Sequence, residues 1–175
     1  PGLKDILARH NLMPQAITLE VTESALIDDV EHCETVLRSL KQMGFGLSLD
    51  DFGTGYSSLS YLKRYPFDKV KIDQSFIREV SHSEVDTVIV KVIISMAHGL
   101  GLRVVAEGVE TELQCDFMRT HVCDEIQGYF LSRPVDAASL QELLRSAQRL
   151  PDHLLRFRRP QHTLLLVDDE PNVLA

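Results

Sequence analysis

The sequence lacks the features that mark membrane-spanning proteins, secreted proteins and basic nucleic-acid-binding proteins. No apolar run approaches the roughly 20 residues needed to span a bilayer, and no signal peptide is present. The chain begins with Pro1 rather than methionine, which leaves room for an upstream targeting, membrane or sensor region. The net charge is −8, so no global basic field attracts a nucleic acid polymer. An anionic phosphate substrate would therefore need cations between it and the protein.

Cysteines are also few and irregularly placed. The three of them, Cys33, Cys115 and Cys123, have neither the spacing of a metal site nor an even number for disulfide pairing. Such cysteines are typical of reduced thiols, so we expect a cytoplasmic protein.

Hairpin signals are missing as well, and strand patterns alternate with helix patterns instead. Predicted strands cover residues 17–23, 46–50, 69–73, 103–106 and 125–129. Predicted helices cover residues 2–13, 30–43, 57–64, 85–100, 110–119 and 136–150. Strands joined by crossover helices indicate a parallel sheet.

A polar residue stands at the same end of each predicted strand. These residues are Glu20, Asp50, Lys71, Glu107 and Gln127, and Asp73 shares a strand face with Lys71. In an open doubly wound sheet, only the strands at the switch point meet a ligand. A β/α barrel would gather all the strand ends around one mouth, where barrel enzymes keep their chemistry. Contributions from every predicted strand therefore favour the barrel.

The most informative stretch is residues 47–58, where an apolar run ends in Asp50 and Asp51 and continues into a glycine loop. Neighbouring side chains of a strand point to opposite faces, so both carboxylates reach one site only where the strand ends and the chain turns. We therefore predict that the strand stops at Asp50. The alternative interpretation is an ordinary acidic turn before a serine helix cap.

The end of the chain departs from the strand–helix pattern. Residues 151–162 contain two prolines and are rich in arginine, which is typical of a linker. Residues 163–167 form an apolar strand pattern that ends in Asp168 and Asp169. We therefore divide the chain into a domain over residues 1–150, a linker over 151–162 and the start of a second domain over 163–175.

Five motifs of the first domain resemble those of the EAL-domain cyclic di-GMP phosphodiesterases. They are Leu-Glu-Val-Thr-Glu at 19–23, Asp-Asp-Phe-Gly-Thr-Gly-Tyr-Ser-Ser at 50–58, Lys-Ile-Asp at 71–73, Ala-Glu-Gly-Val-Glu at 106–110 and Gln-Gly-Tyr at 127–129. The family's Glu-Ala-Leu motif and a strand that supplies an asparagine ligand are absent, and both would lie before Pro1. The resemblance therefore implies a partial (β/α)8 TIM-like barrel that lacks its first strands.

The same resemblance implies an activity, the hydrolysis of cyclic di-GMP to linear pGpG. It implies two divalent cations, Mg²⁺ or Mn²⁺, which prefer oxygen ligands. Glu20 and Asp50 resemble ligands of the first cation, and Asp50 with Asp51 resembles the bridge to the second.

The resemblance also assigns roles to the remaining polar residues. Lys71 is implied to orient or deprotonate the attacking water, and with Asp51 and Glu107 it makes up the implied catalytic residues. Glu107 and Gln127 are implied to hold metal-bound waters, with Glu110 as a support. Glu23 is implied to support the glycine loop that follows Asp51.

The tail resembles a second family, the response-regulator receiver domains. Its sequence Leu-Leu-Leu-Val-Asp-Asp-Glu-Pro at 164–171 is similar to their first strand and acidic pair, here Asp168 and Asp169. In that family the acids bind Mg²⁺ beside an aspartate that accepts phosphate, which this chain does not contain. The implied partners are cyclic di-GMP, a second copy of the chain and a histidine kinase. The alternative for this tail is a terminal strand with an acidic turn.

Two other functions stay open beside an active phosphodiesterase. A degenerate domain would bind cyclic di-GMP or a partner protein without hydrolysis, and such domains typically lose acids or the lysine. A structural barrel would only relay signals to the receiver domain. Because two ligands of the first cation would lie before Pro1, we expect residues 1–175 alone to be inactive and poorly soluble.

Overall fold

A parallel sheet lies at the centre of the computed structural model, which describes residues 2–26, 30–53, 59–80, 82–146 and 150–155. Its five strands are β1 (Thr18–Thr22), β2 (Gly46–Phe52), β3 (Lys69–Ile72), β4 (Arg103–Glu107) and β5 (Glu125–Gln127). Each strand pairs in parallel with the next one along the chain. A doubly wound sheet would reverse this order at a switch point, so the sheet confirms the barrel-type α/β fold. The glycine-loop residues 54–58 and the tail pair Asp168 and Asp169 lie outside the described residues.

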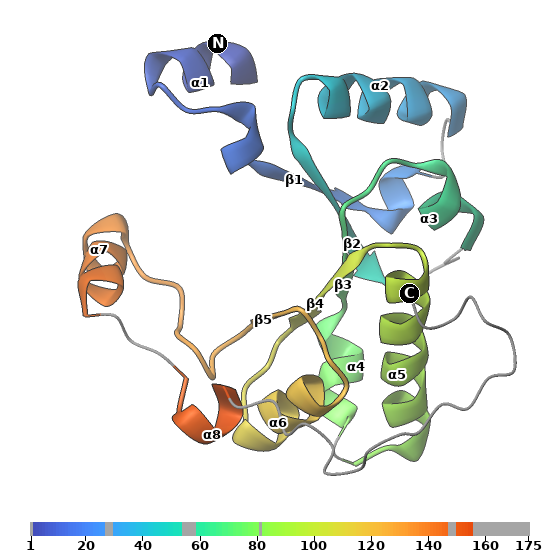
Figure 1. The fold of residues 1–175 in the computed structure, drawn as a ribbon, viewed down its shortest axis with the longest axis vertical. Helices are drawn as coiled ribbons and strands as arrows, with labels where there is room; N and C mark the ends of the chain where they lie inside the picture. The colour runs from blue at the N-terminus through green and yellow to red at the C-terminus, as the bar shows by residue number, and fades with distance from the viewer. Residues whose placement is uncertain (1, 27–29, 54–58, 81, 147–149, 156–175) are drawn as a thin grey trace, which may run out of the picture.

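Helices connect the strands and cover one side of the sheet. They are α1 (Leu3–Arg9), α2 (Val30–Gln42), α3 (Leu59–Arg64), α4 (Gln74–Glu79), α5 (Glu84–Gly99), α6 (Glu112–Thr120), α7 (Ala137–Arg145) and α8 (Asp152–Leu155), with short 3-10 turns at Pro14–Ala16 and Glu23–Leu26. In Figure 1, α2, α3, α5 and α6 lie along one side of the sheet, and α1 and α7 lie on the other side of the picture. No helix within the described residues has the length and apolar composition needed to cross a membrane.

The sheet has one apolar face and one polar face. Leu49, Val70, Ile72 and Val104 are at most 1% exposed and belong to the core cluster that also contains Val90 of α5. Because strand side chains alternate, the intervening positions point to the opposite face, and these positions carry the polar residues identified in the sequence. This face would line the interior if the sheet closed into a barrel.

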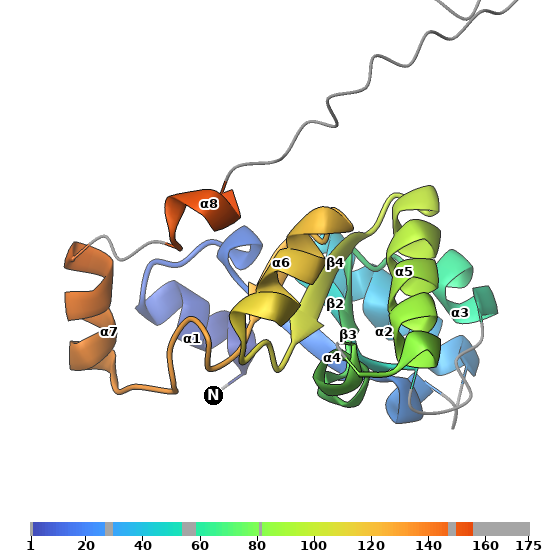
Figure 2. The same ribbon diagram turned by 90° about the horizontal axis from the view of Figure 1, so that it is seen from below.

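The described strands do not close on themselves. Among the described residues, β1 pairs with β2 alone and β5 pairs with β4 alone, so that each has one free edge. In Figure 2, α5 and α3 lie on one side of the strands and α7 lies on the opposite side of the picture. Free edges of this kind are templates for further strand pairing.

The structure differs from the sequence prediction between β3 and α5. Asp73 is not a strand residue that faces the site with Lys71; it is the N-cap of α4, and its carboxylate accepts a hydrogen bond from the Ser75 backbone N–H at 2.9 Å. The reason is that an aspartate followed closely by free backbone N–H groups satisfies the first turn of a helix. With six residues, α4 is too short for a periodic pattern to predict.

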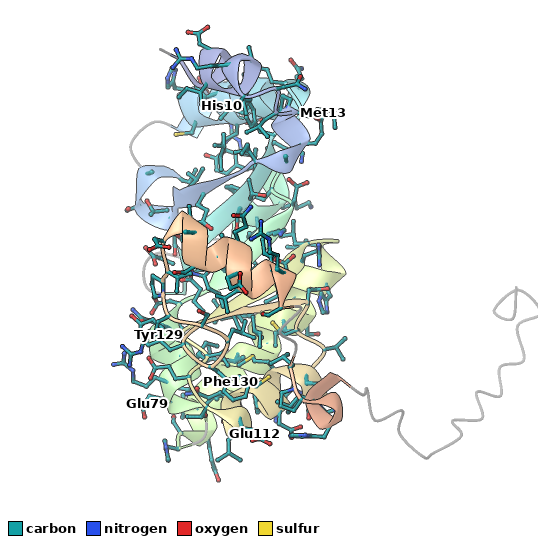
Figure 3. All side chains as sticks on the ribbon, turned by 90° about the vertical axis from the view of Figure 1, so that its left-hand side faces the viewer. His10, Met13, Glu79, Glu112, Tyr129 and Phe130 are labelled. Carbon is teal, nitrogen blue, oxygen red and sulfur yellow. The ribbon has the colours of Figure 1, made fainter. Side chains whose placement is uncertain are left out.

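The predicted linker also begins with ordered structure. Residues Asp152–Leu155 form α8, and Leu154 is only 4% exposed. His153 pairs with Glu112 of α6 at 2.6 Å, and Figure 3 shows Glu112 beside α8. The first part of the predicted linker therefore packs on the body of the domain.

Candidate functional site

A β-bulge in β2 places the two adjacent aspartates. Leu49 pairs with Val70 and Phe52 pairs with Ile72, so β2 contains one more residue than β3 between these pairs. The backbone of Asp51 is left-handed, with φ of 55°. A bulge of this kind turns a side chain that would otherwise point to the opposite face. The strand therefore continues through Asp51 to Phe52, and the prediction that it stops at Asp50 was wrong.

Lys71 lies at the centre of the polar strand ends. Its side chain is 6% exposed, and its Nζ lies 2.6 Å from Glu107 Oε1, 2.9 Å from Glu20 Oε2 and 3.1 Å from Asp50 Oδ1. These partners come from β4, β1 and β2, so the fold brings four strand ends to one point. A buried ammonium needs partners, and the three carboxylates supply them. A solvated acidic turn would leave the lysine exposed.

Burial and charge act in opposite directions on the ionisation of this group. Burial alone would lower the pKa of Lys71, but the carboxylates of Glu107, Glu20 and Asp50 outweigh it and hold the pKa above its ordinary value. Burial raises the pKa of Glu107, Lys71 lowers it in part, and the negative charges of Asp50 and Glu20 raise it further. Lys71 is therefore an ammonium in this arrangement, and additional cations would relieve the repulsion among the acids.

Three of the carboxylates lie close enough together to hold a metal ion, and we call them the metal-ligand group. Carboxylate oxygens of Asp50, Asp51 and Glu107 all lie within 4.8 Å of one another. Such all-oxygen groups fit hard divalent cations such as Mg²⁺ or Mn²⁺. Glu107 belongs to this group, and Glu20 contacts Lys71. The roles that the resemblance implies for them, holding metal-bound waters for Glu107 and ligating the first cation for Glu20, stay predictions.

A pocket of about 410 Å³ opens beside this group. It is lined by the predicted site residues Glu107, Glu110 and Gln127, and by α4 and the segment after β5; the remaining lining residues are Gln74, Arg78, Gly108, Gly128 and Tyr129. Arg133 lies 4.9 Å from the centre of the Tyr129 ring, and Figure 3 shows Tyr129 beside Phe130 at this end of the molecule. Sequence reasoning missed Gln74 and Arg78 because it missed α4, and the Asp-x-Ser cap was the signal that could have found them.

Glu23 was predicted within the first strand, but it lies in the turn directly after β1. The residue is 4% exposed and directly follows β1, as the first residue of the turn Glu23–Leu26. Its predicted support of the glycine loop falls on residues 54–58, outside the described residues. This role stays a prediction.

Comparison with known proteins gives matches over most of the chain. The EAL domain model matches residues 2–134. The chain is 49% identical over 144 residues to the cyclic di-GMP phosphodiesterase NbdA of Pseudomonas aeruginosa, covering 82% of this chain and 18% of NbdA. It is 46% identical over 139 residues to the bifunctional diguanylate cyclase/cyclic di-GMP phosphodiesterase MucR of the same organism, covering 79% of this chain and 20% of MucR. The chain thus spans about a fifth of the length of these curated relatives.

Solved structures have the same fold. The MucR phosphodiesterase in complex with cyclic di-GMP matches with a TM-score of 0.76 at 46% identity, over 79% of this chain and 56% of that chain. BlrP1 of Klebsiella pneumoniae, in complexes with cyclic di-GMP and manganese or calcium, matches with a TM-score of 0.71 at 37% identity, over 75% of this chain and 34% of that chain. The family match over most of the chain and these identities show that the chain belongs to the EAL domain family.

Proposed function

We propose that this chain is part of a cyclic di-GMP phosphodiesterase that hydrolyses its substrate to linear pGpG with two divalent cations, Mg²⁺ or Mn²⁺. The observation that carries this proposal is the group of carboxylates that surrounds Lys71 at the carboxyl ends of the parallel strands. The relatives NbdA and MucR support it through their described activity, and the BlrP1 complexes support the use of a divalent cation.

Asp50, Asp51 and Glu107 would hold the cations, with Glu20 as a further carboxylate. When bound, such cations activate a water molecule and neutralise the charge that builds on the phosphate. Asp50 belongs to the metal-ligand group and also contacts Lys71, and the resemblance implies that Asp50 together with Asp51 would help to hold both cations. The left-handed backbone of Asp51 turns its carboxylate to the same site, at a cost on the order of 1–3 kcal/mol for such a conformation.

Lys71 has the second role in the reaction. Its buried ammonium donates toward three carboxylates, which keeps their oxygens close together. We assign it the orientation of the attacking water rather than removal of a proton, because an ammonium has donors but no lone pair that could accept a proton. One of its N–H groups would turn from a carboxylate to that water. The adjacent pocket, with Glu110, Gln127 and Arg78 in its lining, would take the remainder of the dinucleotide.

The proposal also covers a second domain, its partner, a location and a dimer, which rest on the sequence or on exposed side chains. Residues 163–175, with Asp168 and Asp169, would begin a receiver domain that a histidine kinase phosphorylates in a two-component system of the cytoplasm. A homodimer would cover Val85, Val88 and Val92, which are between 56% and 68% exposed along one face of α5.

A hydrolysis assay on the complete domain tests the proposal. By complete domain we mean residues 1–150 together with the segment proposed to precede Pro1. With Mn²⁺, this protein should convert cyclic di-GMP to pGpG, while residues 1–175 alone should show no product. Binding of cyclic di-GMP by the complete domain without hydrolysis would favour the degenerate module instead. Hydrolysis by residues 1–175 alone would show that the ligands have been misassigned.

A further inference from the structure

Gln114 is a buried polar residue that does not line the pocket. It connects two segments that do line the pocket. Its side chain is on the first turn of α6, and the residue is 6% exposed. Its Oε1 accepts hydrogen bonds from the backbone N–H groups of Glu110 at 2.8 Å and Thr111 at 3.0 Å. Its Nε2 donates to the carbonyl of Ile77 in α4 at 3.2 Å. One amide therefore ties the loop after β4 to the helix after β3.

The two segments are also in close contact at the site itself. A Cβ added to Gly108 would lie 2.6 Å from Cβ of Gln74, so the β4–α6 loop rests directly on the start of α4. Gly108 has φ of 69°, a conformation that favours glycine. The contact at Gly108 and the amide of Gln114 thus hold the loop against α4 at two points, and Glu107 is the residue immediately before the first of them.

The other side of the loop is held by the end of β5. The Val109 N–H donates to the Gln127 carbonyl at 3.1 Å, and the Val109 carbonyl accepts from the Phe130 N–H at 3.0 Å. Val109 itself is completely buried. The loop therefore lies between β5 and α4, and Gln114 supplies its hydrogen bonds toward α4.

We propose that Gln114 is a positioning residue that holds the loop of residues 107–110 against α4 and so sets the placement of the Glu107 carboxylate. The inference rests on the proposed use of metal ions, since its effect would be felt at the carboxylates of Asp50, Asp51 and Glu107. Groups that orient the ligands of a metal site typically change its metal affinity by about 10- to 100-fold when they are removed. Gln114 acts through the backbone and touches no reacting atom, so it is not a catalytic residue.

A simple helix cap is the competing explanation, and the side-chain chemistry separates the two. Gln114 and Thr111 form a capping box, in which the Thr111 hydroxyl accepts from the Gln114 N–H at 3.2 Å. Glutamate serves equally well at this position of a capping box. Gln114→Glu therefore keeps an acceptor for Glu110 and Thr111, replaces the donor to Ile77 by a second carboxylate oxygen and adds a buried negative charge. Thr111→Ala does the reverse, because it weakens the cap of α6 and leaves the contact with α4 intact.

The test measures the Mn²⁺ dissociation constant of the complete domain by titration calorimetry, together with the melting temperature and the hydrolysis rate. Gln114→Glu should weaken Mn²⁺ binding by about 10-fold. Thr111→Ala should lower the melting temperature by a few degrees and leave Mn²⁺ affinity within about twofold. Gln114→Met loses both contacts and should weaken Mn²⁺ binding at least as much, which keeps the test open if a buried carboxylate prevents folding.

Wild-type Mn²⁺ affinity in both Gln114 variants would overturn the inference, as would an equal loss in Thr111→Ala, which would make the cap responsible. The proposed hydrolysis can be wrong while the inference about Gln114 is right, and the measurements distinguish the two. If the wild-type protein binds Mn²⁺ without cleaving cyclic di-GMP and Gln114→Glu still weakens binding, the inference stands and the proposed function does not.

Discussion

The two ends of the sheet carry charge in different ways. At the carboxyl ends of the strands, Glu20, Asp50, Asp51 and Glu107 gather around Lys71. At the amino ends, acids and bases pair nearly one for one; these contacts are Lys41 with Asp68, Lys69 and Arg103 with Glu125, and His98 with Asp124. One end therefore has an excess of negative charge, and the other is balanced.

This difference in charge indicates that the carboxyl ends of the strands serve function and that the amino ends serve the fold. Balanced pairs at a barrel's amino end need no further partner, and partly exposed pairs of this kind contribute little energy each. An acidic group around a single buried ammonium repels itself unless cations bind, so it is a costly arrangement that stability does not explain. This division agrees with β/α barrels, in which the carboxyl-terminal face carries the chemistry. Each prediction below changes one end of the sheet, and the first two use a residue at the other end as the control.

The largest effect is expected from Asp50→Asn in the complete domain. It removes a carboxylate that belongs to the metal-ligand group and contacts Lys71, so turnover of cyclic di-GMP should fall below detection. Glu125→Gln removes an acid that pairs with Lys69 and Arg103 at the opposite end, and it should keep turnover within a few-fold of wild type. Equal turnover in the two variants would remove the distinction between the ends.

Lys71→Met should lower kcat by about 10²- to 10⁴-fold, the range for loss of a group that positions or transfers protons. KM should change far less, because the pocket beside Glu107 is unaltered. Lys69→Met is the matched control, since Lys69 precedes Lys71 by two residues on the same face of β3 and pairs with Glu125. A loss confined to KM in Lys71→Met would make Lys71 a substrate clamp instead.

Glu23→Ala should have a smaller effect, a roughly 10-fold weaker binding of Mn²⁺ or cyclic di-GMP with the fold retained. Its burial directly after β1 puts it next to the site without contributing to the metal-ligand group. Glu31→Ala removes an exposed acid of α2 and controls for the change of net charge. Unchanged Mn²⁺ titration and activity in Glu23→Ala would exclude this residue from the site.

The smallest effect is expected from Asp124→Asn at the amino end. Burial would raise the pKa of Asp124, but hydrogen bonds from His98 and the Val104 N–H outweigh it and lower the pKa. A lowered pKa in the folded state means that the stabilisation is present above the ordinary aspartate pKa and is lost as pH falls through the lowered value. The variant should lose about 0.5–1 kcal/mol of unfolding free energy at pH 7 with kcat unchanged. Thermal melts of both proteins from pH 7 to pH 2.5 should converge at the acid end, and a constant gap would contradict this assignment.

Sequence reasoning predicted the parts of this molecule that depend on local periodicity. The alternation of strands and helices predicted the parallel sheet, and the position of Glu20, Asp50, Lys71 and Glu107 on their strands predicted that these side chains meet. Both follow from spacing along the chain, because parallel strands present equivalent ends at one edge of a sheet.

It failed where the answer depends on a neighbouring strand or on a very short element. The bulge at Asp51 is defined by the pairing of β2 with Val70 and Ile72, which no pattern within β2 contains. Asp73 reads equally well as a strand residue or as a cap, and the six residues of α4 are too few to decide. The bond from Gln114 to Ile77 joins residues 37 positions apart and follows only from packing.

An anomalous-scattering map of the complete domain, crystallised with Mn²⁺ and cyclic di-GMP, tests the central claim most directly. The account predicts two manganese peaks at the carboxylates of Asp50, Asp51 and Glu107, and Lys71 turned from these acids toward a water beside the phosphate. A map with substrate bound, no manganese at these carboxylates and Lys71 still paired with Glu20, Asp50 and Glu107 would contradict it.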